Sequence, residues 1–192
     1  MLDKEKIKHT TYSPGFVTNE EILIRAIIDP DHCKDGELIS GAISRDDLIS
    51  RGFSVFRKQY EKKAHFNNMV NAYLSKNFER KCEGVAKFPT LVAREINNED
   101  GRQAFIVLDD AKIEDDHAHA QILFSEKYSR SKQLKLRKQL LQVLKTLYTI
   151  DEVFEDEKNN DFEEKKRPSS LSKITNSFSL LLNIFLKVFF RK

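Results

Sequence analysis

Short apolar runs separated by turn residues dominate the chain between residues 20 and 126. The runs "EEILIRAII", "FSVF", "GVAKF", "QAFIVLDD" and "AHAQILF" contain the β-branched and aromatic residues that are typical of strands. Segments such as "DPDHCKDG", rich in Asp, Pro and Gly, lie between them and predict turns. The run "GELISGAIS" predicts a further short strand, and an acidic loop joins the last two runs.

Helical patterns are interleaved with these strands. The segment "SRDDLISRG" begins with Ser, has acids in its first turn and ends on Gly, which predicts one or two helical turns. "TLVAREIN" predicts a short helix capped by Thr90. A longer helix is predicted in "KQYEKKAHFNNMVNAYLSKN" by apolar residues at near-helical spacing: Tyr60, Ala64, Met69 or Val70, Tyr73 and Leu74.

This alternation with short connections favours an α+β fold, a compact mixed sheet with short helices, over residues 20–150. Residues 1–19 are expected to be a flexible leader. Residues 127–150 close the domain as a basic amphipathic helix, whose predicted apolar stripe is Leu134, Leu140 or Leu141, Leu144, Leu147 and Tyr148. The polar, charged residues 151–170 predict a linker.

The last segment, residues 171–192, has a charge-free run from Ile174 to Leu186 that is too short to cross a bilayer as a helix. It predicts a C-terminal amphipathic helix that contacts a membrane surface or a partner protein, including another copy of the chain. The predicted buried side carries Phe178, Leu182, Phe185 and Phe189, and the predicted wet side carries Lys187 and Arg191.

The bulk composition adds limits on location and chemistry. The net charge is only +3, so local clusters of charge matter more than the total. Cys33 and Cys82 form no CxxC pair, which predicts no disulfide framework and favours a reducing compartment. With no signal peptide in the N-terminal residues, we expect a cytoplasmic protein, peripheral at the inner face of the membrane if the C-terminal helix binds lipid. Phosphate-loop, dinucleotide, serine-hydrolase and zincin motifs are missing from the sequence.

Two histidines at alternate positions, His117 and His119, would share one face of a strand. Such a pair can bind a metal, with Asp115 and Asp116 as oxygen donors. No third ligand is linked to them by spacing, so we expect no metal and no cofactor. We expect His119 to pack or to form a hydrogen bond within the domain or its pocket region.

Arg25 lies inside the apolar run "ILIRAII" and needs an anionic partner. The first interpretation is structural pairing with Asp109 or Asp110. The alternative is an anionic, nucleotide-like ligand bound by Arg25 together with Ser54 of the later strand "FSVF". An early arginine followed by a serine is similar to ADP-ribosyltransferase-like folds, but the closing glutamate of those enzymes is not identifiable here.

Four short runs, "RAIIDP", "GAIS", "FSV" and "DHAHA", resemble an uncharacterised family of small bacterial proteins with RxIHP, LSV and PAHA-like runs. The resemblance covers about residues 20–124, and the chain departs from it at Asp29 and Ile43. It implies a common fold and a pocket in which His119, rather than His117, accompanies Arg25 and Ser54. It implies no activity.

Three functions remain open at this point. The first is a non-enzymatic interaction module carried to a membrane surface or partner protein by residues 171–192. The second is a small enzyme or a nucleotide- or anion-binding domain with a pocket near Arg25, Ser54 and His119. The third is nucleic-acid binding through the basic helix 127–145. Whether the protein is an enzyme is left undecided by the sequence.

Overall fold

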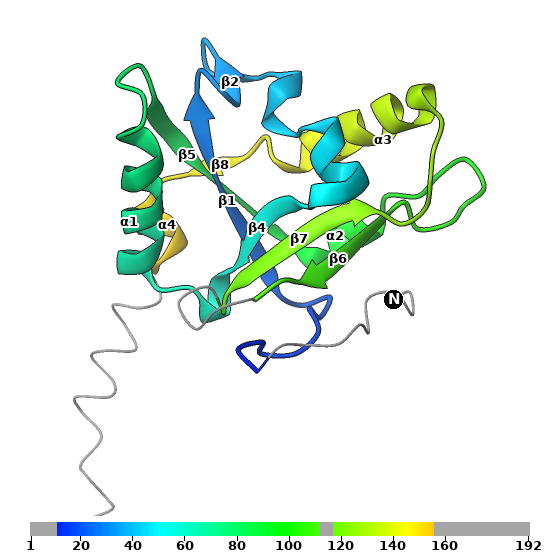
Figure 1. The fold of residues 1–192 in the computed structure, drawn as a ribbon, viewed down its shortest axis with the longest axis horizontal. Helices are drawn as coiled ribbons and strands as arrows, with labels where there is room; N and C mark the ends of the chain where they lie inside the picture. Colours follow the sequence, from blue (N-terminus) through cyan, green and yellow to red (C-terminus); the bar gives the residue numbers. More distant parts are fainter. Residues whose placement is uncertain (1–10, 112–116, 156–192) are drawn as a thin grey trace, which may run out of the picture. The chain divides into compact units, whose positions relative to one another are not determined.

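The computed structural model describes residues 11–111 and 117–155, which contain a six-stranded sheet in the order β6-β7-β4-β1-β5-β8 (Figure 1). Every strand pairing in it is antiparallel. The strands are β1 (Ile22–Asp29), β4 (Phe53–Arg57), β5 (Lys81–Pro89), β6 (Phe105–Asp109), β7 (His119–Phe124) and β8 (Leu147–Tyr148). Together with the helices, this sheet confirms the predicted α+β class.

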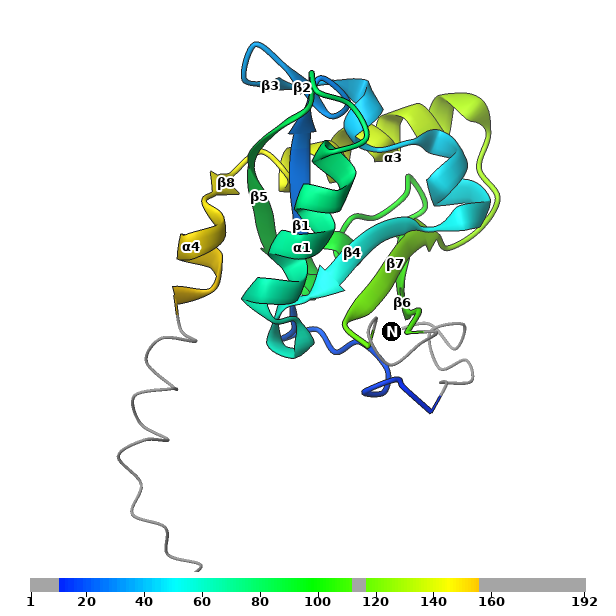
Figure 2. The same cartoon turned by 60° about the vertical axis from the view of Figure 1, so that its left-hand side comes forward.

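Helices cover both faces of the sheet (Figures 1 and 2). One face carries α1 (Lys63–Leu74) and α4 (Ile150–Val153), packed on a small core around Phe66 and Phe154. The other face carries α2 (Thr90–Arg94), α3 (Arg130–Val143) and the turns η2 (Ser40–Ala42) and η3 (Asp47–Arg51), packed on the larger core. A small hairpin of β2 (Cys33–Lys34) and β3 (Glu37–Leu38) follows β1, and η4 (Lys58–Tyr60) joins β4 to α1.

Strand alternation divides the side chains between the two faces. In β4, Phe53 and Val55 enter the larger core, whereas Phe56 points toward α1 and contacts Phe66 edge-to-face. In β7, Ala120 and Ile122 likewise enter the larger core. The residues between them, including Ser54 of β4 and His119 and Gln121 of β7, therefore share the α1 face.

The helices lie where the sequence predicts them, but some of the residues predicted to face the core do not. In α1 the buried residues are Phe66 and Val70, while Tyr60 precedes the helix in η4 and Tyr73 is exposed. Thr90 does not cap α2, because it is the first residue of the helix and its buried hydroxyl donates to the Glu21 carbonyl. The predicted strand "GELISGAIS" contains only the two residues of β3 before the turn η2.

The closing helix is shorter than predicted. Helix α3 ends at Val143 and buries Leu136 and Leu140, whereas Leu134 is exposed. Leu147 and Tyr148 leave the helix and form β8, because they pair with the edge of β5. The fold also continues past the predicted boundary at residue 150. A capping box between Thr149 and Glu152 starts α4, and the following Val153 and Phe154 are buried.

The end of the predicted flexible leader is held by the fold. Val17 is buried in the larger core, and the carbonyls of Gly15 and Phe16 accept hydrogen bonds from Arg57. Arg94 donates to the carbonyl of Val17 and to the side chain of Asn19. Residues 15–19 thus form part of the packed structure, because two buried arginines need their oxygens.

No helix within residues 11–111 and 117–155 has the length and apolar character needed to cross a membrane. The predicted C-terminal helix, residues 171–192, lies outside the described residues. Its amphipathic faces and its contact with lipid or protein therefore stay predictions.

Arg57 is the largest fully buried side chain, and the sequence analysis did not single it out. Its Nε and Nη2 donate to the two carboxylate oxygens of Glu21 at 2.6 and 2.8 Å, and its Nη1 donates to Asp109 at 2.9 Å. The guanidinium also lies 4.6 Å from the ring centroid of Tyr60. One cation thus joins the residue before β1, the end of β4 and the end of β6.

We expect Arg57→Met to lower the free energy of unfolding by about 3–5 kcal/mol, because it leaves two buried carboxylates without their cation. The matched control is Arg51→Met. Arg51 is mostly exposed and pairs with Asp47 one helical turn away, so its loss should cost roughly 0.5 kcal/mol. Urea denaturation followed by circular dichroism measures both values. A cost for Arg57→Met no larger than that of the control would contradict the structural role of this cluster.

Candidate functional site

Strands β1 and β4 pair at only two positions and then separate. Leu23 lies opposite Arg57 and Ile24 lies opposite Phe56, but no pairing follows toward the end of β1 (Figure 1). Beyond this point β1 pairs with β5 alone and β4 pairs with β7 alone. The sheet therefore contains a fork just beyond the pair of Ile24 and Phe56, next to Arg25 and Ser54.

A pocket of about 260 Å³ lies at this fork, beneath α1. Its apolar wall is formed by the two strands and the helix, and its polar groups come from four residues. The apolar residues are Ala26, Ile28, Phe56, Phe66, Met69 and Val70. The polar residues are Arg25, His32, Ser54 and Tyr73. A mostly apolar cavity with a few converging polar groups is the usual form of a small-molecule site.

Arg25 bridges the fork. Its guanidinium donates from Nη1 to the main-chain carbonyl of Ser54 and lies 4.2 Å from the ring centroid of Phe53. Its Nε is buried and has no hydrogen-bond partner in the described structure. Burial lowers the pKa of Arg25 to about 10, against the opposing effect of the Asp47 carboxylate. The side chain therefore stays cationic at neutral pH.

Sheet register brings Ser54, His119 and Asp110 together. Ser54 pairs with Gln121 and Phe56 pairs with His119, so Ser54 and His119 are diagonal neighbours on the α1 face. The Oγ of Ser54 lies 2.6 Å from Nε2 of His119. The amide of Asp110 donates to the carbonyl of His119, which places the Asp110 side chain beside the imidazole.

The second nitrogen of His119 faces a carboxylate. Its Nδ1 lies 3.2 Å from Oδ2 of Asp110, which is ion-pair distance, although the N–H does not point straight at that oxygen. The side chains of His119 and Asp110 are only 14% and 18% exposed. Phe56 contacts the His119 ring edge-to-face with a centroid distance of 5.5 Å. The result is a Ser54–His119–Asp110 chain across β4, β7 and the end of β6.

Gln121 supports this chain from β7. Its amide nitrogen donates to Oδ2 of Asp110. The neighbouring Gly52 ends η3 with a φ of +86°, and a Cβ there would lie 2.2 Å from Oε1 of Gln121. Glycine at position 52 thus leaves the space that the Gln121 side chain fills.

His32 completes the polar side of the pocket from the loop after β1. The amide of Ile28 donates to Nδ1 of His32 at 3.0 Å, so the ring proton lies on Nε2. Burial and the nearby positive charge of Arg25 lower the pKa of His32 to about 4. The neutral ring is therefore favoured in the folded state. This contribution to stability is complete above the ordinary pKa of 6.5 and is lost as the pH falls toward 4.

The structure brings together the three residues that the sequence analysis grouped, Arg25, Ser54 and His119. The predicted pairing of Arg25 with Asp109 or Asp110 is wrong. Adjacent residues project to opposite faces, so Asp109 binds Arg57 while Asp110 faces His119. Among the described residues Arg25 forms no ion pair at all. Asp110 and His32 are site residues that the sequence analysis missed. The place of Asp110 depends on the register of β6 against β7, which no local pattern supplies.

The predicted histidine pair does not act as a pair. His119 opens β7 and binds Ser54, whereas His117 lies in the turn before the strand. Asp115 and Asp116 lie outside the described residues. Within the described ranges no three His, Cys, Asp or Glu residues are grouped as a metal site requires.

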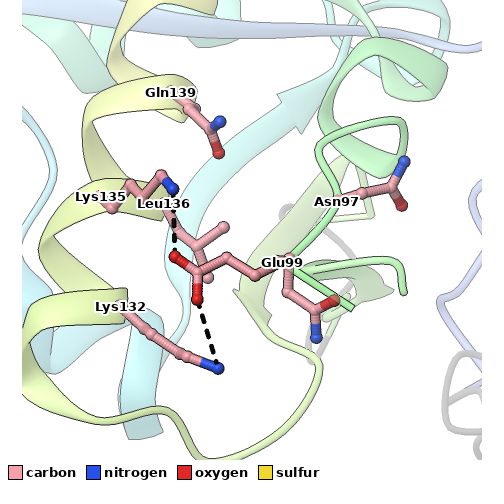
Figure 3. Close-up of a pocket in the computed structure, with 7 residues that line it drawn as sticks. Asn97, Glu99, Lys132, Lys135, Leu136 and Gln139 are labelled. Atoms are coloured by element: carbon pink, nitrogen blue, oxygen red, sulfur yellow. Dashed lines mark hydrogen bonds and ion pairs between the residues drawn. The ribbon is translucent and has the colours of Figure 1, made fainter. Parts of the chain in front are cut away.

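A second depression lies on the opposite side of the sheet, between α3 and the loop after α2 (Figure 3). Glu99 lies there between Lys135 and Lys132, at 3.1 and 3.7 Å. These lysines lower the pKa of the Glu99 carboxyl. The only carboxylate among the described residues that line this depression already pairs with both lysines, so the depression offers a ligand less than the pocket at the fork. Two lysines of the basic helix proposed for nucleic acid are thereby engaged within the protein.

No family model, curated protein or solved structure matches the chain. The resemblance noted in the sequence therefore stays a prediction. The proposed function therefore rests on the geometry of the pocket at the fork.

The proximity of Arg25 and His32 is testable by titration. We expect the His32 imidazole to titrate with a pKa of about 4 in the native protein, and Arg25→Gln to raise that value because one positive charge is removed. Histidine side-chain NMR between pH 3.5 and 8 measures it, with His32→Asn to assign the signal. Arg102→Gln, at an exposed arginine of a distant loop, should leave the titration unchanged. Equal His32 titration in wild type and Arg25→Gln would contradict the proximity of the Arg25 charge to this imidazole.

Proposed function

We propose that the protein binds a small ligand in which a single carboxylate is attached to an apolar body. The observation that carries this proposal is the state of Arg25. It is a cation at the pocket with a buried Nε that lacks a partner, and no described carboxylate forms an ion pair with it. A partly buried cation that forms no ion pair is unfavourable, so an anion from solution would be stabilised there.

A carboxylate suits the guanidinium better than a more highly charged group. Two parallel hydrogen bonds from an arginine match the two oxygens of a carboxylate. The other arginine near the pocket mouth, Arg80, already forms an ion pair with Asp31 at 2.8 Å and lies against the ring of Tyr73. One available cation favours a ligand with one negative charge.

The remaining wall selects an apolar body. Phe56 and Phe66 line the pocket and contact each other edge-to-face, and Met69 supplies a flexible thioether that adapts to irregular shapes. A volume of about 260 Å³ is at the small end for ligand pockets. The occupant is therefore expected to be of the size of an arylacetate or a medium-chain fatty acid.

The test compares phenylacetate and hexanoate with the neutral phenylacetamide. We expect Arg25→Gln to weaken carboxylate binding by roughly 10- to 100-fold, because it removes a charge-assisted hydrogen bond worth about 1.5–3 kcal/mol. Binding of the amide should change little. Two-dimensional NMR titration of the full chain gives the affinities and shows whether shifts cluster on Phe56, Phe66 and Met69.

Arg102→Gln is the matched control, since it removes an equal charge from an exposed site. It should leave all three affinities unchanged. Carboxylate binding that is equally strong in wild type and Arg25→Gln would reject the proposal, as would shifts confined to residues outside the pocket.

Recruitment to a membrane surface or partner protein by residues 171–192 is compatible with this proposal. It concerns residues outside the described ranges and stays a prediction. Nucleic-acid binding by α3 is supported only by its basic residues, of which Lys132 and Lys135 already pair with Glu99.

A further inference from the structure

We propose that Ser54 is a nucleophile and that the pocket hydrolyses small carboxylic esters. This inference rests on the proposed function, because the bound carboxylate would be the acid product of the reaction. Ser54 lines the pocket and its hydroxyl lies 2.6 Å from a ring nitrogen of His119. A serine that is hydrogen-bonded to a histidine, itself oriented by a carboxylate, is the arrangement that activates a hydroxyl for attack.

The hydrogen bond to Ser54 sets the roles of the two ring nitrogens of His119. For Nε2 of His119 to accept the Ser54 hydroxyl proton, the neutral ring must carry its own proton on Nδ1. Nδ1 lies 3.2 Å from Oδ2 of Asp110, which is ion-pair distance once the ring is protonated. Asp110 is therefore the positioning residue: it favours the productive tautomer and stabilises the imidazolium that forms during attack. Gln121 in turn holds the Asp110 carboxylate.

The oxyanion has a natural partner in Arg25. The guanidinium binds the main-chain carbonyl of Ser54, so its charge lies next to the residue that would attack. It is held in a partly dry site, where a fixed positive charge stabilises developing negative charge more strongly than in water. The same group would hold the carboxylate of the product.

These groups alone account for every bond and proton of the acylation step. The Oγ of Ser54 bonds to the ester carbonyl carbon, its proton moves to Nε2 of His119, and the carbonyl electron pair moves to oxygen beside Arg25. The intermediate then collapses, the bond to the alcohol oxygen breaks, and that oxygen takes the proton from His119. An acyl ester on Ser54 and a free alcohol remain.

Deacylation repeats the same transfers with water. His119 takes one proton from water, whose oxygen bonds to the acyl carbon, and the proton returns to Oγ of Ser54 as the acyl bond breaks. The products are a carboxylic acid and the regenerated serine. One ester and one water give one acid and one alcohol, so the reaction needs no oxidant, reductant or further reactant.

The direct test is covalent labelling of the full chain with a short-chain alkyl fluorophosphonate. The Oγ of an activated serine bonds to phosphorus and fluoride leaves with the hydroxyl proton. We expect one adduct per chain by intact mass, located on Ser54 by peptide mapping. Mapping on the wild-type protein needs no variant, so the result does not depend on the folding of a mutant.

Variants then show whether Ser54 is labelled because it is activated or only because it is accessible. Ser54→Ala should abolish labelling, whereas Ser50→Ala, at an exposed serine of η3, should leave it unchanged. His119→Gln should slow labelling by about 100-fold or more, as expected for loss of a general base. In Asp110→Asn the inflection of the pH–rate profile should move to lower pH, because the imidazolium loses its counter-charge. A purely structural role of Asp110 would not move that inflection.

Lack of an adduct at millimolar reagent, or an adduct on any residue other than Ser54, would overturn this inference. An unchanged labelling rate in His119→Gln would do the same. These outcomes are distinct from failure of the proposed function, which is judged by phenylacetate binding in Ser54→Ala and in Arg25→Gln. Binding that depends on Arg25 but occurs without any serine reactivity would leave a carboxylate-binding protein that is not an esterase.

Discussion

A fully buried guanidinium must find counter-charges inside the protein, and Arg57 finds them on two segments that are far apart in the chain. Glu21 leads into β1, and Asp109 ends β6. Because β1 carries Arg25, β4 carries Ser54 and the turn after β6 carries Asp110, this single cluster joins the segments that present these three site residues. Removing Arg57 alone costs more than any one of its hydrogen bonds, since both carboxylates would stay buried without their cation.

Two arginines of the sheet, Arg57 and Arg25, differ in how many partners their guanidinium groups have. Arg57 has both carboxylates of its cluster and two main-chain carbonyls, whereas Arg25 has one carbonyl and one aromatic ring in the described structure. The adjacent Asp109 and Asp110 also differ, one serving the structure and the other the site. One completes a structural ion pair, and the other faces His119 on the opposite side of the sheet. Incomplete satisfaction of polar groups is expected at functional sites rather than in supporting cores.

Hydrophobic patterning predicted most strands and helices of the described domain, because alternation and helical spacing are local properties. It could not predict the register of β4 against β7, which depends on residues 65 positions apart and sets the Ser54–His119 contact. The structural partner of Arg25 was predicted wrongly for the same reason. Which aspartate faces which arginine is decided by the pleat and by the fork between β1 and β4. The early end of α3 was also a tertiary effect, since β5 offers Leu147 and Tyr148 an edge to pair with.

We propose that Arg25 provides the charge for an anion at the fork between β1 and β4. A crystal structure of the full chain grown with phenylacetate tests it most directly. We expect the carboxylate on the Arg25 guanidinium, within reach of the Ser54 hydroxyl, and the phenyl ring against Phe66 and Met69. A structure in which Arg25 is neutralised by an internal carboxylate, with the phenylacetate elsewhere, would contradict it.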